Sequence, residues 1–542
     1  MTNKYGFKAK LAKNIFSKIQ QNKKRENYLK YFKFNENIDL LSVYKNARRW
    51  ILANTVENKG IRPTVDMEGK LNNIAYPEVS GYYIPSLLKF GFRDLAKQYA
   101  NWLLSIQHEN GAWHDYLDKA PYVFDTGQII KGLIAIYPIM PEVKGAIIKA
   151  CDYIISQIQD DGRLPTPSDD FWPENICTEL IHLYCLSALV DAGELFNRPD
   201  YKTAAHKVLE YYKKNNLEQI LDFHTLSHFY AYMVEALVDL GEIELAKTAM
   251  DKIAKIQKKN GFIPAYKNVN WTCSTGLFQF AVIWYKLGEK TKADLTFDYA
   301  CSLQTKNGGW LGSYGKNANY AQFKEISWAV KYFLDALNLK ISSHFAKTVD
   351  KNVPQMGGTY PLSDYISDND GRLKLILEKI NCLHSGEKIV DVGCGLGRIL
   401  KKIVQSRNDL EIYGVDIAQE IISKLPDKVE GKIGSLLQIP FDDNFSDFTM
   451  TSEALEHALD IENAVKELVR ITKKGGKVLI IDKDIKAKGA LETPPWEQWF
   501  DIEELKNIMT KCGLKVEVIE NIPYGSKNCA NGLYVAWFGE KL

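Results

Sequence analysis

The order of apolar and polar positions divides the chain into two parts. In residues 35–340, apolar stretches of helical length alternate with polar turns that carry the pattern Gln-x-x-x-Gly or Gln-x-x-Gly. The turns start at Gln107, Gln159, Gln257 and Gln304, at intervals of 52, 98 and 47 residues. Because 98 is about two periods, we expect a degenerate copy near residues 213–216. The pattern predicts helical hairpins that repeat along this part of the chain.

The second helix of each hairpin differs in composition from the first. Residues 180–190 and 275–285 almost lack charge, as helices buried on all sides should, whereas residues 201–213 and 243–255 carry many charges. Six hairpins with such an inner and outer ring resemble the (α/α)6 toroid of six-hairpin glycosidases, polysaccharide lyases and terpenoid cyclases. The Asp-x-Asp-Asp motif of protonating cyclases does not occur. The inner helices are predicted to begin near Glu78, Phe124, Asn175, Thr225, Trp271 and Phe323.

After a polar run with Pro354, Gly357 and Gly358, the pattern changes to alternating strands and helices. An apolar stretch at 388–392 passes directly into glycines at every second position, which predicts a buried parallel strand, a tight turn and a helix. A second strand ends at Asp416, 19 residues beyond Gly397. This spacing predicts a doubly wound parallel sheet with an acid at its second strand end.

Four motifs follow one another in this half: 388–398, 412–416, 434–441 and 445–457. Their order and spacing resemble the class I S-adenosylmethionine-dependent methyltransferases over about residues 365–540. A nicotinamide-binding fold is disfavoured, because a Gly-x-Gly-x-Gly turn replaces the Gly-x-Gly-x-x-Gly fingerprint. Many relatives have Asp at the position of Ser435. The resemblance implies cofactor binding by Asp391, Gly393, Cys394, Gly395, Gly397, Asp416, Ile417, Ser435, Leu436 and Glu453, with S-adenosylhomocysteine as the product.

These patterns give four segments. Residues 1–34 form a basic amphipathic segment, 35–340 the all-α toroid, 341–363 a linker and 364–542 the α/β methyltransferase domain. In the last domain we expect an entry helix at 364–382, a strand at 474–481, an aromatic insertion at 494–500 and a closing antiparallel pair at 516–521 and 533–538.

Charge and cysteine content limit the classes of binding partner and the compartment that we expect. The 542 residues carry a formal charge of +2, which gives no reason to expect nucleic acid, and nine scattered cysteines are typical of a reducing cytoplasm. We see no metal-ligand spacing. Residues 1–33 hold ten Lys or Arg against one acid, so they either pack on the next domain or contact anionic lipid at the inner face of a membrane. The oligomeric state is not predicted.

In a toroid, the loops before the inner helices converge on one mouth. Aromatic rings with carboxylates between them are suited to sugars, although Asp before a helix often caps it and Trp or Tyr can close a core. Paired acids there could also support hydrolysis, β-elimination or epimerisation. The candidates for substrate contacts are Trp113, Asp125, Gln128, Trp172, Glu174, Glu179, His228 and Trp271.

Methyl transfer to a hydroxyl requires a base, and His457 follows the predicted fourth strand of the second domain. The alternative is a structural histidine that caps the next helix. The sequence predicts a methyltransferase that O-methylates a carbohydrate or glycoconjugate during surface polysaccharide synthesis, with the toroid binding or modifying the glycan. Alternatives are an inert toroid scaffold, an independent toroid lyase, epimerase or hydrolase, and a lipid, polyketide or terpenoid acceptor.

Overall fold

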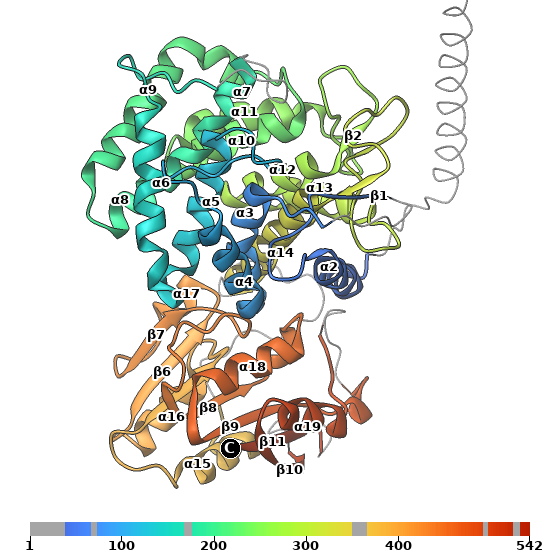
Figure 1. Cartoon of the computed structure of the whole chain (residues 1–542). Helices are drawn as coiled ribbons and strands as arrows, with labels where there is room; N and C mark the ends of the chain where they lie inside the picture. Colours follow the sequence, from blue (N-terminus) through green and yellow to red (C-terminus); the bar gives the residue numbers. More distant parts are fainter. Residues whose placement is uncertain (1–37, 67–72, 167–175, 349–365, 491–496, 524–531) are drawn as a thin grey trace, which may run out of the picture.

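The computed structural model describes residues 38–66, 73–166, 176–348, 366–490, 497–523 and 532–542. Residues 38–348 form the helical region, and residues 366–542 form the sheet region beneath it in Figure 1. The basic segment 1–34, Trp172 and Glu174 lie outside the described residues, as do residues 349–363 of the expected linker and 494–496 of the expected insertion. Among the described helices, none has the length and apolar character needed to cross a membrane.

The helical region is built from six pairs of helices that follow one another along the chain. The second members contact each other in a closed sequence, from α3 through α5, η3, α10, α12 and α14 back to α3. This closed packing is what two concentric rings require, while membership of the six-hairpin class stays a prediction. The pairs are α2 (Leu40–Asn54) and α3 (Pro77–Lys89); α4 (Arg93–Ser105) and α5 (Val123–Ile136); α6 (Lys144–Ser156) and α7 (Ile176–Leu180), η3 (Ile181–Cys185), α8 (Leu186–Leu195); α9 (Pro199–Leu221) and α10 (Ser227–Asp239); α11 (Ile243–Ile256) and α12 (Ser274–Lys286); α13 (Lys290–Cys301) and α14 (Ser327–Thr348).

The Gln-x-x-x-Gly turns at Gln107, Gln257 and Gln304 contact the next outer helix. Gln107 Nε2 donates to the carbonyl of Gly111 within its own turn and to the carbonyl of Ala146 in α6, both at 2.9 Å. Gln304 does the same with Gly308 and with Val43 in α2. The last turn therefore closes the ring against the first helix.

Glycine is required in this turn for two reasons. Gly261 has φ +87°, in the left-handed region, and a Cβ at this position would lie 1.9 Å from the Leu295 carbonyl oxygen. The next outer helix thus rests directly on the turn. The repeat motif has a structural role, as expected of shared loop geometry.

Near residues 213–216, where a degenerate copy was predicted, two helical stretches meet at a kink within α9 and no Gln-x-x-x-Gly turn forms. Helix α9 continues to Leu221, and Asn216 alone departs from helical angles, with φ −135° and ψ 22°. The missing Gln and Gly explain this difference, since nothing in 213–216 supplies the clamp or the left-handed residue.

Two short two-stranded sheets lie outside the main sheet in the described residues. Strand β1 (Thr64–Asp66) pairs with β4 (Lys324–Ile326), and β2 (Thr272–Cys273) pairs with β3 (Ser313–Tyr314). The 3₁₀ turns η1 (Tyr137–Ile139) and η2 (Pro141–Val143) lie between α5 and α6.

The sheet region contains a seven-stranded sheet of order β10-β11-β9-β8-β5-β6-β7. The pairs among β7, β6, β5, β8 and β9 are parallel, and β9, β11 and β10 pair antiparallel. The predicted strands at 474–481 and 516–521 fall within β9 and β10, and the one at 533–538 overlaps β11 from its first residue. The strands are β5 (Lys388–Val392), β6 (Glu411–Asp416), β7 (Val429–Ile433), β8 (Ser446–Ser452), β9 (Thr472–Lys483), β10 (Leu514–Ile522) and β11 (Tyr534–Lys541).

Helices cover both faces of this sheet, as a doubly wound fold requires. Strand order reverses between β6 and β8 on either side of β5, which creates a crevice at the carboxyl ends of these strands. The helices are α15 (Gly371–Ile380), α16 (Arg398–Ser406), α17 (Gln419–Ile422), α18 (Ile461–Ile471) and α19 (Ile502–Lys511), with short turns η4 (Leu455–His457) and η5 (Ile485–Ala487).

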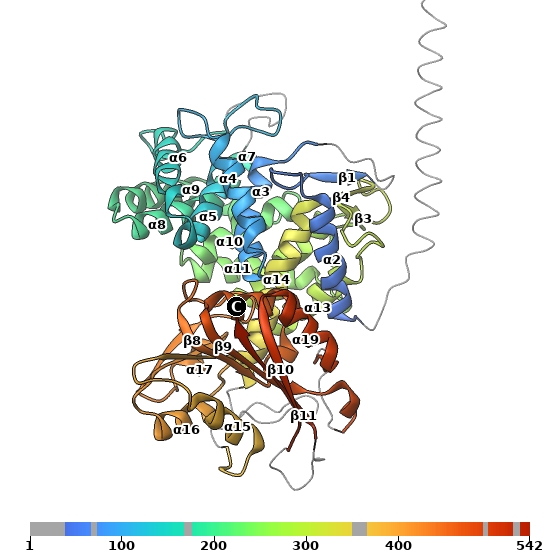
Figure 2. The ribbon, with the colours of Figure 1, turned by 60° about the horizontal axis from the view of Figure 1, so that its bottom comes forward.

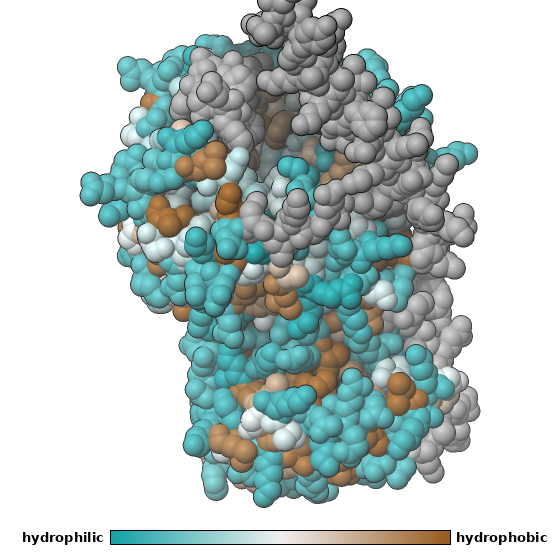
Figure 3. Space-filling model, turned by 45° about the vertical axis from the view of Figure 1, so that its right-hand side comes forward, coloured by the Kyte–Doolittle hydropathy of each residue, from teal (hydrophilic) through white to brown (hydrophobic). Residues whose placement is uncertain are grey.

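The two regions meet through specific contacts. Arg48 of α2 forms a 2.6 Å ion pair with Asp460, the N-cap of α18, and the Asn463 amide donates to the Phe90 carbonyl at 3.3 Å. Helix α14 also contacts α17 (Figure 2). On the face seen in Figure 3, hydrophilic residues cover most of the described surface, and apolar residues form small separate groups. This is the distribution expected when most large apolar side chains are buried.

Candidate active site

The site begins at the turn between β5 and α16. Gly393, Gly395 and Gly397 all have positive φ, at 80°, 51° and 72°. A Cβ on Gly393 would lie 2.3 Å from the Cβ of Ala454, so a larger residue would push the turn away from the β8 end. The backbone of this turn is therefore open to close approach by a ligand.

Two acids stand at the ends of adjacent strands beside this turn. Asp416, at the end of β6, accepts hydrogen bonds from the backbone N–H groups of Gly395 at 3.1 Å and Ala418 at 3.2 Å. Burial raises its pKa. Burial also raises the pKa of Asp391 to about 7, with a further contribution from the charge of Asp416. A cationic or hydroxyl-bearing ligand would offset the free energy needed to keep these buried carboxyl groups ionised.

Glu453 follows β8 with a left-handed φ of 54°. Its carboxylate contacts Arg372, Tyr534 and Arg398, the last at 2.5 Å. Burial alone would raise its pKa, but the charges of Arg372, Arg398 and Lys483 outweigh burial and lower this pKa to about 2. Arg372 in turn donates hydrogen bonds to the Asp370 carboxylate from Nε at 3.0 Å and from Nη2 at 2.7 Å. Glu453 therefore fastens α15, α16 and β11 to the end of β8.

His457 ends η4 and is partly buried. Burial lowers its pKa to about 4, against the opposing effect of the Glu497 carboxylate, so the imidazole is neutral near pH 7. Its Nε2 lies 3.5 Å from Glu456 Oε1. Ligand atoms of Glu456, His457 and Glu497 lie within 4.8 Å of one another, a spacing that a metal ion could bridge. The Lys483 ammonium contacts Glu456 and lies 3.7 Å from Glu497, so a cationic side chain already balances part of the negative charge of this cluster.

These groups surround one cavity of about 190 Å³. The predicted residues Asp391, Cys394 and Gly397 do not line it: Asp391 is 2% exposed and Cys394 7% exposed. Ala454, Ala458 and Leu459 line it without having been predicted, as do Lys89, Phe90, Asn338 and Ile341 of the helical region. The predicted residues that line the cavity are Gly393, Gly395, Asp416, Ile417, Ser435, Leu436, Glu453 and His457.

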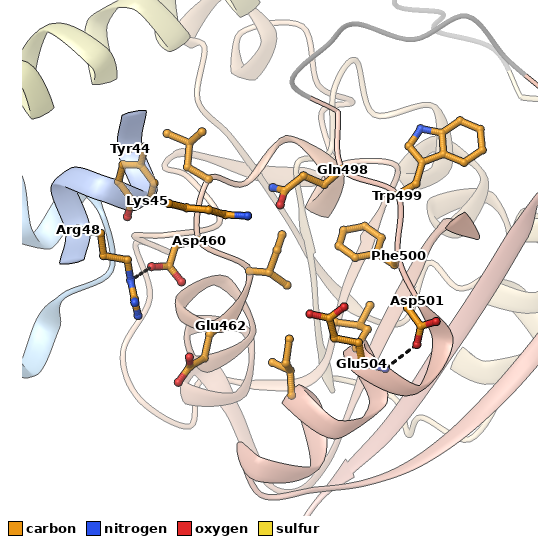
Figure 4. A pocket seen from close by; sticks show the side chains of 14 residues that line it. Tyr44, Lys45, Arg48, Asp460, Glu462, Gln498, Trp499, Phe500, Asp501 and Glu504 are labelled. Carbon is orange, nitrogen blue, oxygen red and sulfur yellow. Dashed lines mark hydrogen bonds and ion pairs between the residues drawn. The ribbon is translucent and has the colours of Figure 1, made fainter. Parts of the chain in front are cut away.

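A second cavity of about 420 Å³ lies where α2 meets the segment 498–508 (Figure 4). Leu459 lines this cavity and the first one, so the two are neighbours on either side of the segment 457–460. The Gln498 backbone N–H donates to the Glu456 carbonyl at 3.0 Å, which ties this wall to the His457 turn. The polar and aromatic side chains around the cavity are Tyr44, Lys45, Arg48, Asp460, Glu462, Gln498, Trp499, Phe500, Asp501 and Glu504.

In the helical region, polar groups are buried at the start of the inner helices. Asp125 is 2% exposed, and its Oδ2 has no hydrogen-bond partner in the described part of the chain. Burial raises the pKa of Asp125 well above its usual range, and burial and the Asp125 charge do the same for Glu78, which was not predicted as a site residue. Within the same described ranges, Gln128 Oε1 also has no partner, and His228 Nδ1 lies 2.7 Å from Gln279 Oε1.

Other predicted mouth residues hold parts of the ring together. The Trp113 indole donates to the Leu103 carbonyl at 2.8 Å. Glu179 accepts from Arg163 Nε and Nη2 at 2.9 and 2.7 Å. Trp271 packs edge-on against Tyr266 with ring centroids 5.7 Å apart. Through these contacts the three side chains stabilise the ring. A role for them in substrate binding stays a prediction.

The sheet order and the glycine turn at its switch point define a Rossmann-like methyltransferase fold. The family described as "Methyltransferase domain" matches residues 390–480. Those residues include the end of β5, the glycine turn, Asp416, Glu453 and His457. The chain therefore contains a methyltransferase domain, and its cofactor is S-adenosylmethionine.

Similar proteins agree on this domain. An uncharacterized methyltransferase of Schizosaccharomyces pombe is 28% identical over 159 residues, which are 27% of this chain and 51% of the relative. Tocopherol O-methyltransferase of Arabidopsis thaliana is 30% identical over 124 residues, or 21% of this chain and 35% of the relative. The chain thus spans about half or less of these two relatives. A solved methyltransferase of Aquifex aeolicus is 19% identical, with a TM-score of 0.28 over 37% of this chain and 98% of that one.

The residues present fit this cofactor. The left-handed glycines leave room for a ligand against the backbone, and Asp416 retains lone pairs that can accept from ribose hydroxyls. Ile417 and Leu436 supply apolar surface in the cavity for a flat base. When bound, S-adenosylmethionine supplies an electrophilic methyl group on a sulfonium. This chain's residues would orient that group, exclude water and receive a proton from the acceptor.

Proposed function

We propose that this protein transfers a methyl group from S-adenosylmethionine to a hydroxyl of a carbohydrate or glycoconjugate in surface polysaccharide synthesis. The observation that carries the proposal is that His457 lines the same cavity as the cofactor residues while remaining neutral near pH 7. A neutral imidazole can accept the proton that the attacking hydroxyl loses. The carboxylates of Glu497 and Glu453 would stabilise its protonated form, while the Lys483 ammonium opposes them.

The acceptor would enter from the neighbouring cavity at α2. Phe500 and Tyr44 offer aromatic surface there, and Gln498 and Glu504 offer hydrogen-bonding groups (Figure 4). This mixture suits a ring that is apolar on its C–H faces and polar at its edges. The buried polar groups of the helical region, Asp125 among them, would hold or modify another part of the same glycan.

Two alternatives have support of their own. A lipid, polyketide or terpenoid acceptor is favoured by Phe90, Ile341 and Leu459 in the cofactor cavity, and similar proteins include enzymes named for tocopherol and sterols. An independent lyase, epimerase or hydrolase site is favoured by Glu78 and Asp125, whose raised pKa values would keep a proton available.

Two experiments test the proposal. Isothermal titration of the purified full chain with S-adenosylhomocysteine should show binding that Asp416→Ala abolishes. Release of S-adenosylhomocysteine should then rise when sugars and glycolipids are supplied as acceptors, and much less with sterols or tocopherols. Absence of binding by the folded chain would refute the methyltransferase proposal. Turnover confined to the apolar acceptors would refute the carbohydrate proposal alone.

A further inference from the structure

One wall of the cofactor cavity comes from the helical region. Lys89 and Phe90 stand at the end of α3, and Asn338 and Ile341 belong to α14. They share the cavity with the loop 434–437, which the family resemblance places at the adenine end of the cofactor. An adjoining cavity of about 530 Å³ is again lined by Lys89 and Asn338 together with this loop. Two separate helices thus meet the same end of the site.

The contact that positions this wall is close. Gly91 has φ +78°, and a Cβ there would lie 2.8 Å from the Asn463 Cβ and 3.2 Å from the Leu437 carbonyl oxygen. The Phe90 carbonyl accepts from the Asn463 amide at 3.3 Å. The turn after α3 therefore rests directly on the loop 434–437 and on α18. The wall is held by backbone contact rather than by long flexible side chains.

The side chain of Asn338 is available to a ligand, whereas the charge of Lys89 already acts on Asp335 and lowers its pKa. Across the described ranges, the side chains of Lys89 and Asn338 make no hydrogen bond or ion pair. On the opposite side, Ser435 Oγ accepts from the Leu437 N–H at 3.2 Å, so its hydroxyl is partly committed to the loop. Many relatives have an acid at this position. Ser435 thus offers no charge to the adenine end, which faces an uncommitted amide in the helical region.

We propose that the helical region completes the cofactor pocket and that Asn338 recognises the edge of the adenine base. This inference rests on the proposed function, because it takes S-adenosylmethionine as the ligand. A carboxamide carries both groups that this edge requires: its oxygen accepts from an exocyclic amine, and its nitrogen donates to a ring nitrogen. Asn338 thereby takes the part that an acid at position 435 would otherwise play.

The test is isothermal titration of the full chain with two ligands, S-adenosylhomocysteine and its analogue in which a hydrogen replaces the exocyclic amine. We expect Asn338→Leu to weaken S-adenosylhomocysteine binding about tenfold, as expected for loss of a hydrogen bond to a ligand. Binding of the analogue without the amine should change by less than about threefold, because only the bond from the Asn338 nitrogen to the ring nitrogen can be lost from it. Asn101→Leu is the matched control, since Asn101 is exposed on α4 and lines none of these cavities.

The outcomes separate the two proposals. Equal binding of S-adenosylhomocysteine by Asn338→Leu and the parent chain would overturn the inference. An equal loss for both ligands would also overturn it, because a general distortion of the wall does not distinguish the bases. Asn338→Ser keeps a short polar group, so its affinity for S-adenosylhomocysteine should lie between those of the parent and Asn338→Leu. This smaller substitution controls for misfolding of Asn338→Leu. If the folded parent chain binds neither ligand, the methyltransferase proposal fails first.

Discussion

Replacing Glu453 by Gln tests how the cofactor site is held together. The carboxylate joins Arg372 of α15, Arg398 of α16 and Tyr534 of β11, and Arg372 is only 3% exposed. An amide keeps the shape of the side chain but leaves two arginine charges without their shared anion. We expect the sheet region to lose stability, and α15 to loosen from the end of β8.

The magnitude follows from the pKa of Glu453. Its ordinary value is 4.5 and its value in the fold is about 2, a shift that corresponds to about 3 kcal/mol at about 1.4 kcal/mol per unit. Because the pKa is lowered in the folded state, this stability is present above pH 4.5 and is lost as the pH falls towards 2. Arg372 keeps its bonds to Asp370 in the variant and Arg398 is 29% exposed, so the loss should not exceed this value.

Urea unfolding of the parent chain and of Glu453→Gln, followed by tryptophan fluorescence at pH 7 and at pH 4 to 3, measures the difference. The free energy of unfolding of the variant should be lower by about 3 kcal/mol at pH 7. This difference between the variant and the parent chain should become smaller between pH 4 and pH 3. Glu430→Gln, an exposed carboxylate on β7, is the control and should change little. A gap below about 1 kcal/mol at pH 7, or one that does not depend on pH, would refute the account of Glu453 as a charge anchor.

Three further predictions concern the site and the ring. His457→Ala should bind S-adenosylhomocysteine as the parent does but lose at least about 100-fold in kcat with saturating acceptor; full turnover would remove His457 as the base. Asp391 does not line the cavity but lies just before the glycine turn, so it would act on the ligand through its charge; because its pKa is raised to about 7, S-adenosylhomocysteine should bind more weakly at pH 6 than at pH 8 in calorimetry, by up to about tenfold. Asp391→Asn should abolish that pH dependence, and a dependence that survives would assign it elsewhere. Gly261→Ala should lower the free energy of unfolding by about 2 kcal/mol more than Gly241→Ala, because both have positive φ but only the first would strike a neighbouring helix. Equal losses in urea unfolding would contradict the clamp described for this turn.

Local features of the site could be predicted from the sequence, because they depend on residues close together in the chain. The glycine turn, Asp416 and the order of the strands follow from an apolar run, alternating glycines and a spaced acid. The repeated Gln and Gly positions likewise indicated hairpins. In each case the backbone needs a particular residue within a few positions, so the pattern is visible without a structure.

Contacts between distant segments were not predicted. Nothing in the chain near Arg372 or Tyr534 shows that both contact Glu453, which lies 81 residues from each. Periodicity tells which face of a helix is buried, but it does not tell which helices face each other. The pairing of Glu78 with Asp125, and the approach of Asn338 to the loop 434–437, required the packing of the rings and of the two regions.

The contact of the Gln304 turn with α2 has a consequence for how such a chain could arise. The first and last hairpins of the helical region are joined by the same side-chain clamp as the Gln107 and Gln257 turns make, although they lie at opposite ends of this region of the chain. The ring therefore does not depend on which hairpin comes first in the chain. A circular permutant, with the old ends joined and new ends opened at another turn, should keep every clamp. The methyltransferase domain follows the last hairpin, at this seam. A gene fusion at that point adds a catalytic partner without interrupting any hairpin.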